Sequence, residues 1–124
     1  MKISKLFLAC VLSGMVGSVF AAPVKLSCVY ESYSLDGEPR GEREIVVEFD
    51  EKTGDFKYWD FAGTEMTGNN PTIRSSLIQW WSGNGSTKYI INRKTGEFTR
   101  NFSDKRYDKK EYGSCVLAGS NTKF

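Results

Sequence analysis

This chain of 124 amino acids lacks the side chain that most often serves in acid–base catalysis. It contains no histidine, and its three cysteines are Cys10, Cys28 and Cys115. Without histidine, the usual general base, the serine and cysteine triads in their common forms and the commonest metal ligand are absent. The 15 Asp and Glu residues could provide a carboxylate pair for a glycosidase, but no pair stands out. We therefore expect no catalytic residue, no metal site and no cofactor, and a carboxylate-based hydrolase is the least favoured alternative.

A tryptophan pair followed by a glycine-rich loop indicates a binding surface instead. Trp80 and Trp81 end an apolar run, and the loop from Ser82 to Ser86 follows them. Because side chains alternate along a strand, one tryptophan faces inward and the other outward. An outward tryptophan beside such a loop could anchor a protein partner or stack on a sugar ring, unless loops cover both faces. The predicted binding residues are Trp80, Trp81, Ser82, Asn84, Lys88 and Tyr89.

The first 21 residues are typical of a secretory signal peptide. Lys2 and Lys5 precede an apolar run, and small residues end the segment before Pro23. The apolar run is short for a bilayer span and contains glycines, which disfavours a membrane anchor. We predict cleavage after Ala21, a single domain over residues 22–124, and export to the periplasm or out of the cell.

Export determines what we expect of the cysteines and of the net charge. Cys10 is lost with the leader, whereas Cys28 and Cys115 remain near opposite ends of the mature chain. In an oxidising compartment such a pair predicts a disulfide. The full chain has 17 Lys and Arg residues and 15 Asp and Glu residues, so removal of Lys2 and Lys5 equalises the two numbers. Net charge therefore gives no argument for nucleic acid or membrane binding.

The mature chain shows almost no helical period and consists of short β-rich runs separated by turn residues. Seven or eight short strands at this spacing predict an all-β domain, a single antiparallel sandwich or small barrel with one disulfide. The expected strands are Leu26–Tyr30, Glu44–Phe49, Phe56–Phe61, Leu77–Trp81, Lys88–Asn92, Phe98–Phe102 and Gly113–Leu117.

Two segments share one pattern, DEKTGDF from Asp50 and NRKTGEF from Asn92. The leading Asp or Asn side chain can accept a hydrogen bond from the backbone N–H two residues later, as in a type I turn. Gly54 and Gly96 then supply the positive φ of a bulged hairpin. We therefore interpret both segments as β-hairpin tips.

The layout of the chain resembles two groups of exported bacterial proteins. The leader, the early Cys28, the Ile-Gln-Trp strand, the Tyr-Ile-Ile-Asn-Arg-Lys-Thr-Gly hairpin and the late Gly-Ser-Cys are similar to those of small exported proteins of Gram-negative bacteria whose function is not recorded. The segment from Ser82 to Tyr89 resembles the Ser-Gly-x-Lys-Tyr motif of periplasmic inhibitors of C-type lysozyme, which are small disulfide-linked β-barrels. Four residues separate Gly83 from Lys88 where that family has one. This resemblance implies an inhibitory role for Ser82, Lys88 and Tyr89.

Taken together, these features predict a non-enzymatic protein-binding module of inhibitor or immunity type. Its expected partner is another envelope or secreted protein, and we expect no nucleic acid ligand and no membrane span once the leader is removed. A carbohydrate or cell-wall binder that uses the same aromatic residues is the alternative.

Overall fold

The protein folds into antiparallel β-strands joined by turns. A computed structural model describes residues 23–103 and 110–118, and these residues contain nine strands and no helix. The predicted leader, residues 1–21, lies outside the described residues. In chain order the strands are β1 (Val24–Tyr33), β2 (Pro39–Phe49), β3 (Phe56–Trp59), β4 (Glu65–Met66), β5 (Asn69–Ile73), β6 (Leu77–Trp81), β7 (Thr87–Asn92), β8 (Glu97–Phe102) and β9 (Glu111–Leu117).

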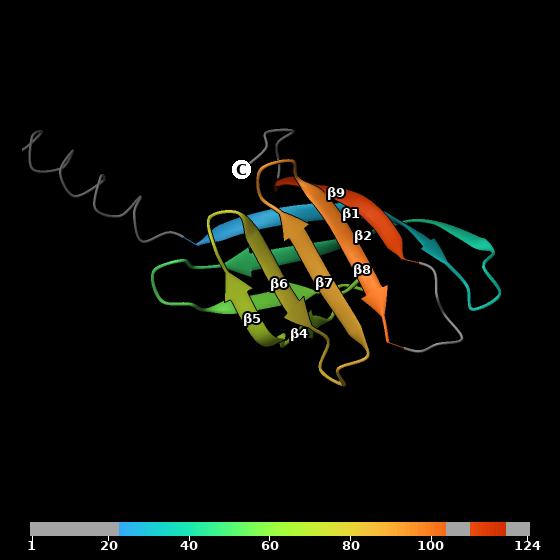
Figure 1. Ribbon diagram of the computed structural model, residues 1–124, viewed down its shortest axis with the longest axis horizontal. Helices are drawn as coiled ribbons and strands as arrows, with labels where there is room; N and C mark the ends of the chain where they lie inside the picture. Colours follow the sequence, from blue (N-terminus) through green and yellow to red (C-terminus); the bar gives the residue numbers. More distant parts are fainter. Residues whose placement is uncertain (1–22, 104–109, 119–124) are drawn as a thin grey trace, which may run out of the picture.

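All nine strands belong to one sheet, in the order β4-β3-β2-β1-β9-β8-β7-β6-β5. Its two edge strands, β4 and β5, are separated in the chain only by Thr67 and Gly68. The sheet must therefore curl until its edges approach each other, and Figure 1 shows the front strands β6–β8 crossing over β1 and β2 behind them. At the link, a Cβ on Gly68 would lie 2.7 Å from the Phe56 ring and 2.9 Å from Trp80. A side chain at position 68 would require these two rings to move, so glycine suits this link.

The all-β antiparallel prediction is confirmed, and the strand number is corrected from seven or eight to nine. In place of the expected sandwich or small barrel, the one curled sheet forms a half-barrel. The two strands missing from the prediction are β4 and β5. The first has two residues, and the second contains Pro71, which removes a ladder donor and is tolerated because β5 is an edge. β3 ends at Trp59 and not at Phe61, because the Asp60 side chain starts a turn by accepting hydrogen bonds from the backbone N–H groups of Ala62 and Thr64 at 3.0 and 2.9 Å.

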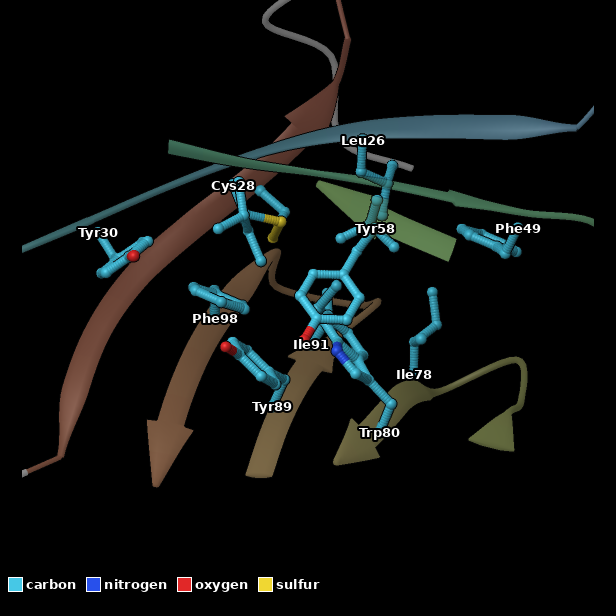
Figure 2. Close-up of a cluster of buried hydrophobic side chains, with 13 residues drawn as sticks. Leu26, Cys28, Tyr30, Phe49, Tyr58, Ile78, Trp80, Tyr89, Ile91 and Phe98 are labelled. Atoms are coloured by element: carbon cyan, nitrogen blue, oxygen red, sulfur yellow. A yellow bond between two sulfur atoms is a disulfide. The ribbon is translucent and has the colours of Figure 1, made fainter. Parts of the chain in front are cut away.

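The core lies between the two layers of the curled sheet and is rich in aromatic rings (Figure 2). Trp80 is stacked on Tyr89 with ring centroids 4.8 Å apart, and both rings lie 5.4 Å from Tyr58. Such contacts contribute beyond the apolar area that they bury. The buried core residues are Leu26, Cys28, Tyr30, Ile45, Val47, Phe49, Tyr58, Ile78, Trp80, Tyr89, Ile91, Phe98 and Cys115.

The predicted disulfide is present and joins two central strands. Cys28 on β1 and Cys115 on β9 face each other directly in the antiparallel ladder, and both are fully buried. Their separation in the chain is 87 residues. The bond therefore fixes the first strand beside the last one.

The two related segments are hairpin tips, as predicted. Asp50 accepts a hydrogen bond from the Lys52 N–H at 2.9 Å, and Asn92 accepts one from the Lys94 N–H at the same distance. Gly54 and Gly96 both have φ of 80°. The pattern thus encodes a local turn geometry twice, at β2–β3 and at β7–β8.

Replacement of both Cys28 and Cys115 by alanine is expected to lower the free energy of unfolding by about 4–5 kcal/mol, because the unfolded chain loses a long covalent loop. Urea denaturation followed by tryptophan fluorescence measures the change, and wild-type protein kept in a thiol reductant should lose a similar amount. Ser114→Ala, at an exposed position beside Cys115, is the control and should change little. A loss below about 1 kcal/mol for the double variant, in the range of ordinary surface substitutions, would contradict this role of the bond.

Candidate functional site: paired clefts at one end of the half-barrel

A cleft of about 440 Å³ lies at the end of the half-barrel where β6 turns into β7. This turn is at the lower end of the front strands in Figure 1. The floor of the cleft consists of core side chains from four strands, Tyr30, Ile45, Tyr58 and Tyr89. Its rim includes Phe61, Ser82, Asn84, Ser86 and Arg100.

A second cleft of about 310 Å³ adjoins the first. The two share Ser86, Thr87 and Arg100, so we call them the paired clefts. The second cleft is also lined by Leu35, Arg40, Arg43, Phe102 and Glu111, which come from the β1–β2 hairpin and from β8 and β9. The site is therefore assembled from segments that are distant in the sequence and adjacent in the sheet.

The Arg100–Glu111 ion pair lies between the two clefts. The two residues face each other across the β8–β9 ladder, and Glu111 is only 1% exposed. Arg100 Nη1 donates a hydrogen bond to Glu111 Oε1, and the Tyr33 backbone N–H donates to Oε2 at 2.9 Å. The buried carboxylate thus connects β9 to both neighbouring strands, which compensates part of its desolvation cost.

Aromatic rings surround the Arg100 guanidinium. Its central carbon lies 4.8 Å from the centroid of Tyr30, 5.4 Å from Tyr89 and 5.1 Å from Phe102. Burial lowers the pKa of Arg100, but the neighbouring tyrosines and Glu111 together raise it above its usual value. Arg100 therefore carries a permanent positive charge. Its Nε atom is buried and has no hydrogen-bond partner among residues 23–103 and 110–118.

The β6–β7 loop forms a preorganised rim. Asn84 Oδ1 accepts hydrogen bonds from the hydroxyls of Ser82 and Ser86, at 2.8 and 2.7 Å, and from the Ser86 N–H at 3.0 Å. Asn69 reaches across from β5 and donates to the carbonyl oxygens of Ser82 and Gly83. These bonds hold the loop in one conformation, so little ordering would be required on binding.

The predicted binding residues lie on two different faces of the sheet. Ser82 and Asn84 are on the cleft rim and Tyr89 is on its floor, whereas Trp80 is fully buried beneath it. Trp81 and Lys88 face the outside, with the Lys88 ammonium 5.5 Å from the Trp81 ring centroid. The tryptophan pair therefore alternates as expected. Of the three residues implied by the lysozyme-inhibitor resemblance, Ser82 and Tyr89 share the cleft and Lys88 does not.

Sequence reasoning missed Arg43, Phe61, Arg100 and Glu111. Arg100 did leave a signal, because it occupies the inward face of β8 between Phe98 and Phe102. A charged residue at an inward position of an alternating strand indicates either a buried ion pair or a site. Glu111 left no corresponding signal in the sequence, because its burial depends on the pairing of β9 with β1 and β8.

A third cleft of about 370 Å³ lies at the opposite end, between Pro23 and the Asp50–Asp55 tip. The Asp50 carboxylate there accepts hydrogen bonds from the Lys52 and Thr53 N–H groups. This cleft contains none of the predicted binding residues. The paired clefts are therefore the candidate site.

No protein-family model, curated protein or solved structure matches this chain. Both resemblances noted in the sequence therefore stay predictions. The described residues contain no helix that is long and apolar enough to cross a membrane, and no group of three or more His, Cys, Asp or Glu residues that could hold a metal ion.

Alkaline pH is expected to destabilise the protein through the tyrosines of the cleft floor. Burial raises the pKa of Tyr30 and Tyr58 above their usual value, because the phenolate would be desolvated. Since the folded pKa is the higher one, their contribution is complete below the unfolded pKa of about 10 and is lost as pH rises beyond it. The free energy of unfolding should therefore be level up to about pH 9.5 and fall above it.

Urea denaturation between about pH 8 and 11.5 measures this dependence, and Tyr58→Phe should make the decline less steep. Tyr112→Phe is the control, because Tyr112 is 57% exposed and should leave the slope unchanged. Equal slopes for wild type and Tyr58→Phe would contradict the assignment of the effect to the buried phenol.

Proposed function

We propose that this chain is a non-enzymatic binding protein that holds a segment of another protein in the paired clefts. The observation that carries the proposal is the position of two exposed apolar side chains. Leu35 is 63% exposed and lines one cleft, and Phe61 is 55% exposed and lines the other. Exposed apolar groups beside a concave, polar-rimmed site are typical of surfaces that contact protein partners.

The composition of the site favours a peptide segment as occupant. Tyrosine and arginine are the residues most often found at the energetic centre of protein interfaces. Here Tyr30 and Tyr89 form part of the floor of the first cleft, Arg100 lines both clefts, and the serines and asparagine of the β6–β7 loop border the first. Apolar contacts from Leu35 and Phe61 would then flank the polar ones.

The structure gives less support to the carbohydrate alternative. Sugar rings stack on accessible aromatic faces, and the outward-facing candidates are Trp59 and Trp81. Lys25 and Lys57 each place an ammonium 5.4 Å from the Trp59 ring centroid, and Lys88 lies 5.5 Å from that of Trp81. A sugar would have to displace these lysines before it could stack.

The acids of the paired clefts are also engaged in structural contacts, which supports binding over catalysis. Asp60 accepts two backbone hydrogen bonds within its turn, and Glu111 is ion-paired with Arg100. The raised pKa of Tyr30 and Tyr58 makes these phenols poor proton acceptors near neutral pH. A carboxylate-based hydrolase would need a carboxyl group that is free to exchange a proton with a substrate, whereas Asp60 and Glu111 are engaged in the contacts described above.

The expected location of the protein fits this role. A buried disulfide between the first and last strands is typical of proteins that fold in an oxidising compartment. Export would place the paired clefts in the envelope or outside the cell. The partner would then be an envelope or secreted protein, which an inhibitor or immunity-type module could block.

A photo-crosslinking amino acid such as p-benzoylphenylalanine at position 61 should capture a discrete protein when the full chain is expressed in its own host. The matched control places the same group at position 112, on the outer face. Phe61 and Tyr112 are both aromatic and are 55% and 57% exposed, so they differ mainly in the face they occupy. The expected result is a crosslinked band from position 61 that is absent from position 112.

Equal capture from both positions, or none from position 61, would reject the protein-partner proposal. Retention of the uncrosslinked chain on purified peptidoglycan in that case would favour the carbohydrate alternative.

A further inference from the structure

Among the residues that the structure describes, positive charge exceeds negative charge in the second of the paired clefts. Three arginines, Arg40, Arg43 and Arg100, line it together with one acid, Glu111, which pairs with Arg100. Arg40 is held in place because its Nη2 donates a hydrogen bond to the Tyr33 carbonyl at 2.9 Å. A low-dielectric site with unbalanced arginines favours an anionic group.

Arg43 is placed to bind such a group at the junction of the two clefts. Its guanidinium stacks on Phe61, with the central carbon 3.9 Å from the ring centroid. Within residues 23–103 and 110–118, Arg43 forms no salt bridge. Stacking fixes the plane of a guanidinium but leaves the N–H groups along its edge able to donate to a carboxylate.

Two other arginines of this protein show what a completed site of this type contains. Arg93 lies over the Phe49 ring and pairs with the Glu51 carboxylate. Arg100 lies over Tyr30 and pairs with Glu111. In both cases an aromatic ring supports the guanidinium and a carboxylate accepts its hydrogen bonds.

Arg43 is supported by the Phe61 ring, but no carboxylate among the described residues pairs with it. This difference indicates a carboxylate beside Arg43, in the cleft that Arg100 also lines.

We propose that the paired clefts bind an acidic segment of the protein partner. An Asp or Glu side chain, or a chain-terminal carboxylate, lies between Arg43 and Arg100, and an adjacent apolar side chain packs on Phe61 or Leu35. This inference rests on the proposed binding function and specifies the chemistry of its partner. The exposed apolar side chains distinguish such a segment from a simple anion, which would gain nothing from them.

Two tetrapeptides that are N-acetylated and C-amidated test the inference directly, Glu-Leu-Glu-Leu and its uncharged counterpart Gln-Leu-Gln-Leu. Each is titrated into the ¹⁵N-labelled mature protein while amide chemical shifts are recorded. The acidic peptide should give saturable shifts at residues 40–43, 82–87 and 100, with an affinity at least about tenfold higher than that of the glutamine peptide. Its affinity should fall as salt is added.

Arg43→Gln should remove most of the preference for the acidic peptide. Arg74→Gln is the matched control, because it makes the same change in net charge at an exposed position outside the paired clefts. Arg100→Lys is the second variant, since it keeps the charge beside Glu111 and removes the fork of N–H donors. It should weaken the acidic peptide while preserving the folded amide spectrum.

Three results would overturn the inference: equal affinity for both tetrapeptides, equal losses in Arg43→Gln and Arg74→Gln, or the same shifts produced by inorganic phosphate at equal concentration. The last would identify a general anion site. Crosslinking from position 61 is measured independently, so a protein partner captured there would leave the proposed function standing while the acidic-segment inference fails.

Discussion

The insertion of β9 between β1 and β8 is the contact on which the rest of the structure depends. The chain makes two antiparallel units, β1 to β4 and β5 to β8, and only the last strand joins them into one sheet. It pairs with β1 over Leu117 to Gly113 and with β8 over Ser114 to Glu111. Such a long-range pairing has a large loop-closure entropy, which the disulfide reduces by restricting the unfolded chain. The same strand carries Glu111, so one element completes both the core and the candidate site.

The buried ion pair follows from this position and is not explained by stability alone. A buried salt bridge often stabilises no more than a well-packed apolar pair would, because both charges are desolvated. Glu111 is fully buried, and its oxygens accept from Arg100 on β8 and from the Tyr33 N–H on β1. This arrangement fixes the orientation of Arg100 at the wall shared by the paired clefts. In the proposed binding function this oriented positive charge would contact the partner, and an apolar pair could not supply it.

The sequence allowed the local features to be predicted and left the non-local ones open. Seven strands were recognisable from alternation, and the Asp50 and Asn92 tips from turn chemistry, because each signal lies within a few residues. β4 and β5 were missed because the curl of the sheet, and not an apolar pattern, positions them. Ser82, Asn84 and Tyr89 were placed in the candidate site because they lie in one segment. Arg43 and Arg100 join them only through the order of strands around β9, and alternation along a single strand cannot show that order.

The two ends of the half-barrel differ in whether the arginine that lies over an aromatic ring also pairs with a carboxylate. At the end formed by the two related tips, Arg93 pairs with Glu51, lies over Phe49 and donates to the Arg74 carbonyl, so its polar groups are matched within the chain. At the other end Phe61 remains exposed, and the arginine stacked on it has no carboxylate among the described residues. Both ends place an arginine over an aromatic ring. An exposed aromatic ring and an unpaired arginine contribute less to stability than a completed ion pair would. Proteins retain such features chiefly at functional surfaces. Under the proposed function, this difference assigns partner contact to the end that carries the paired clefts.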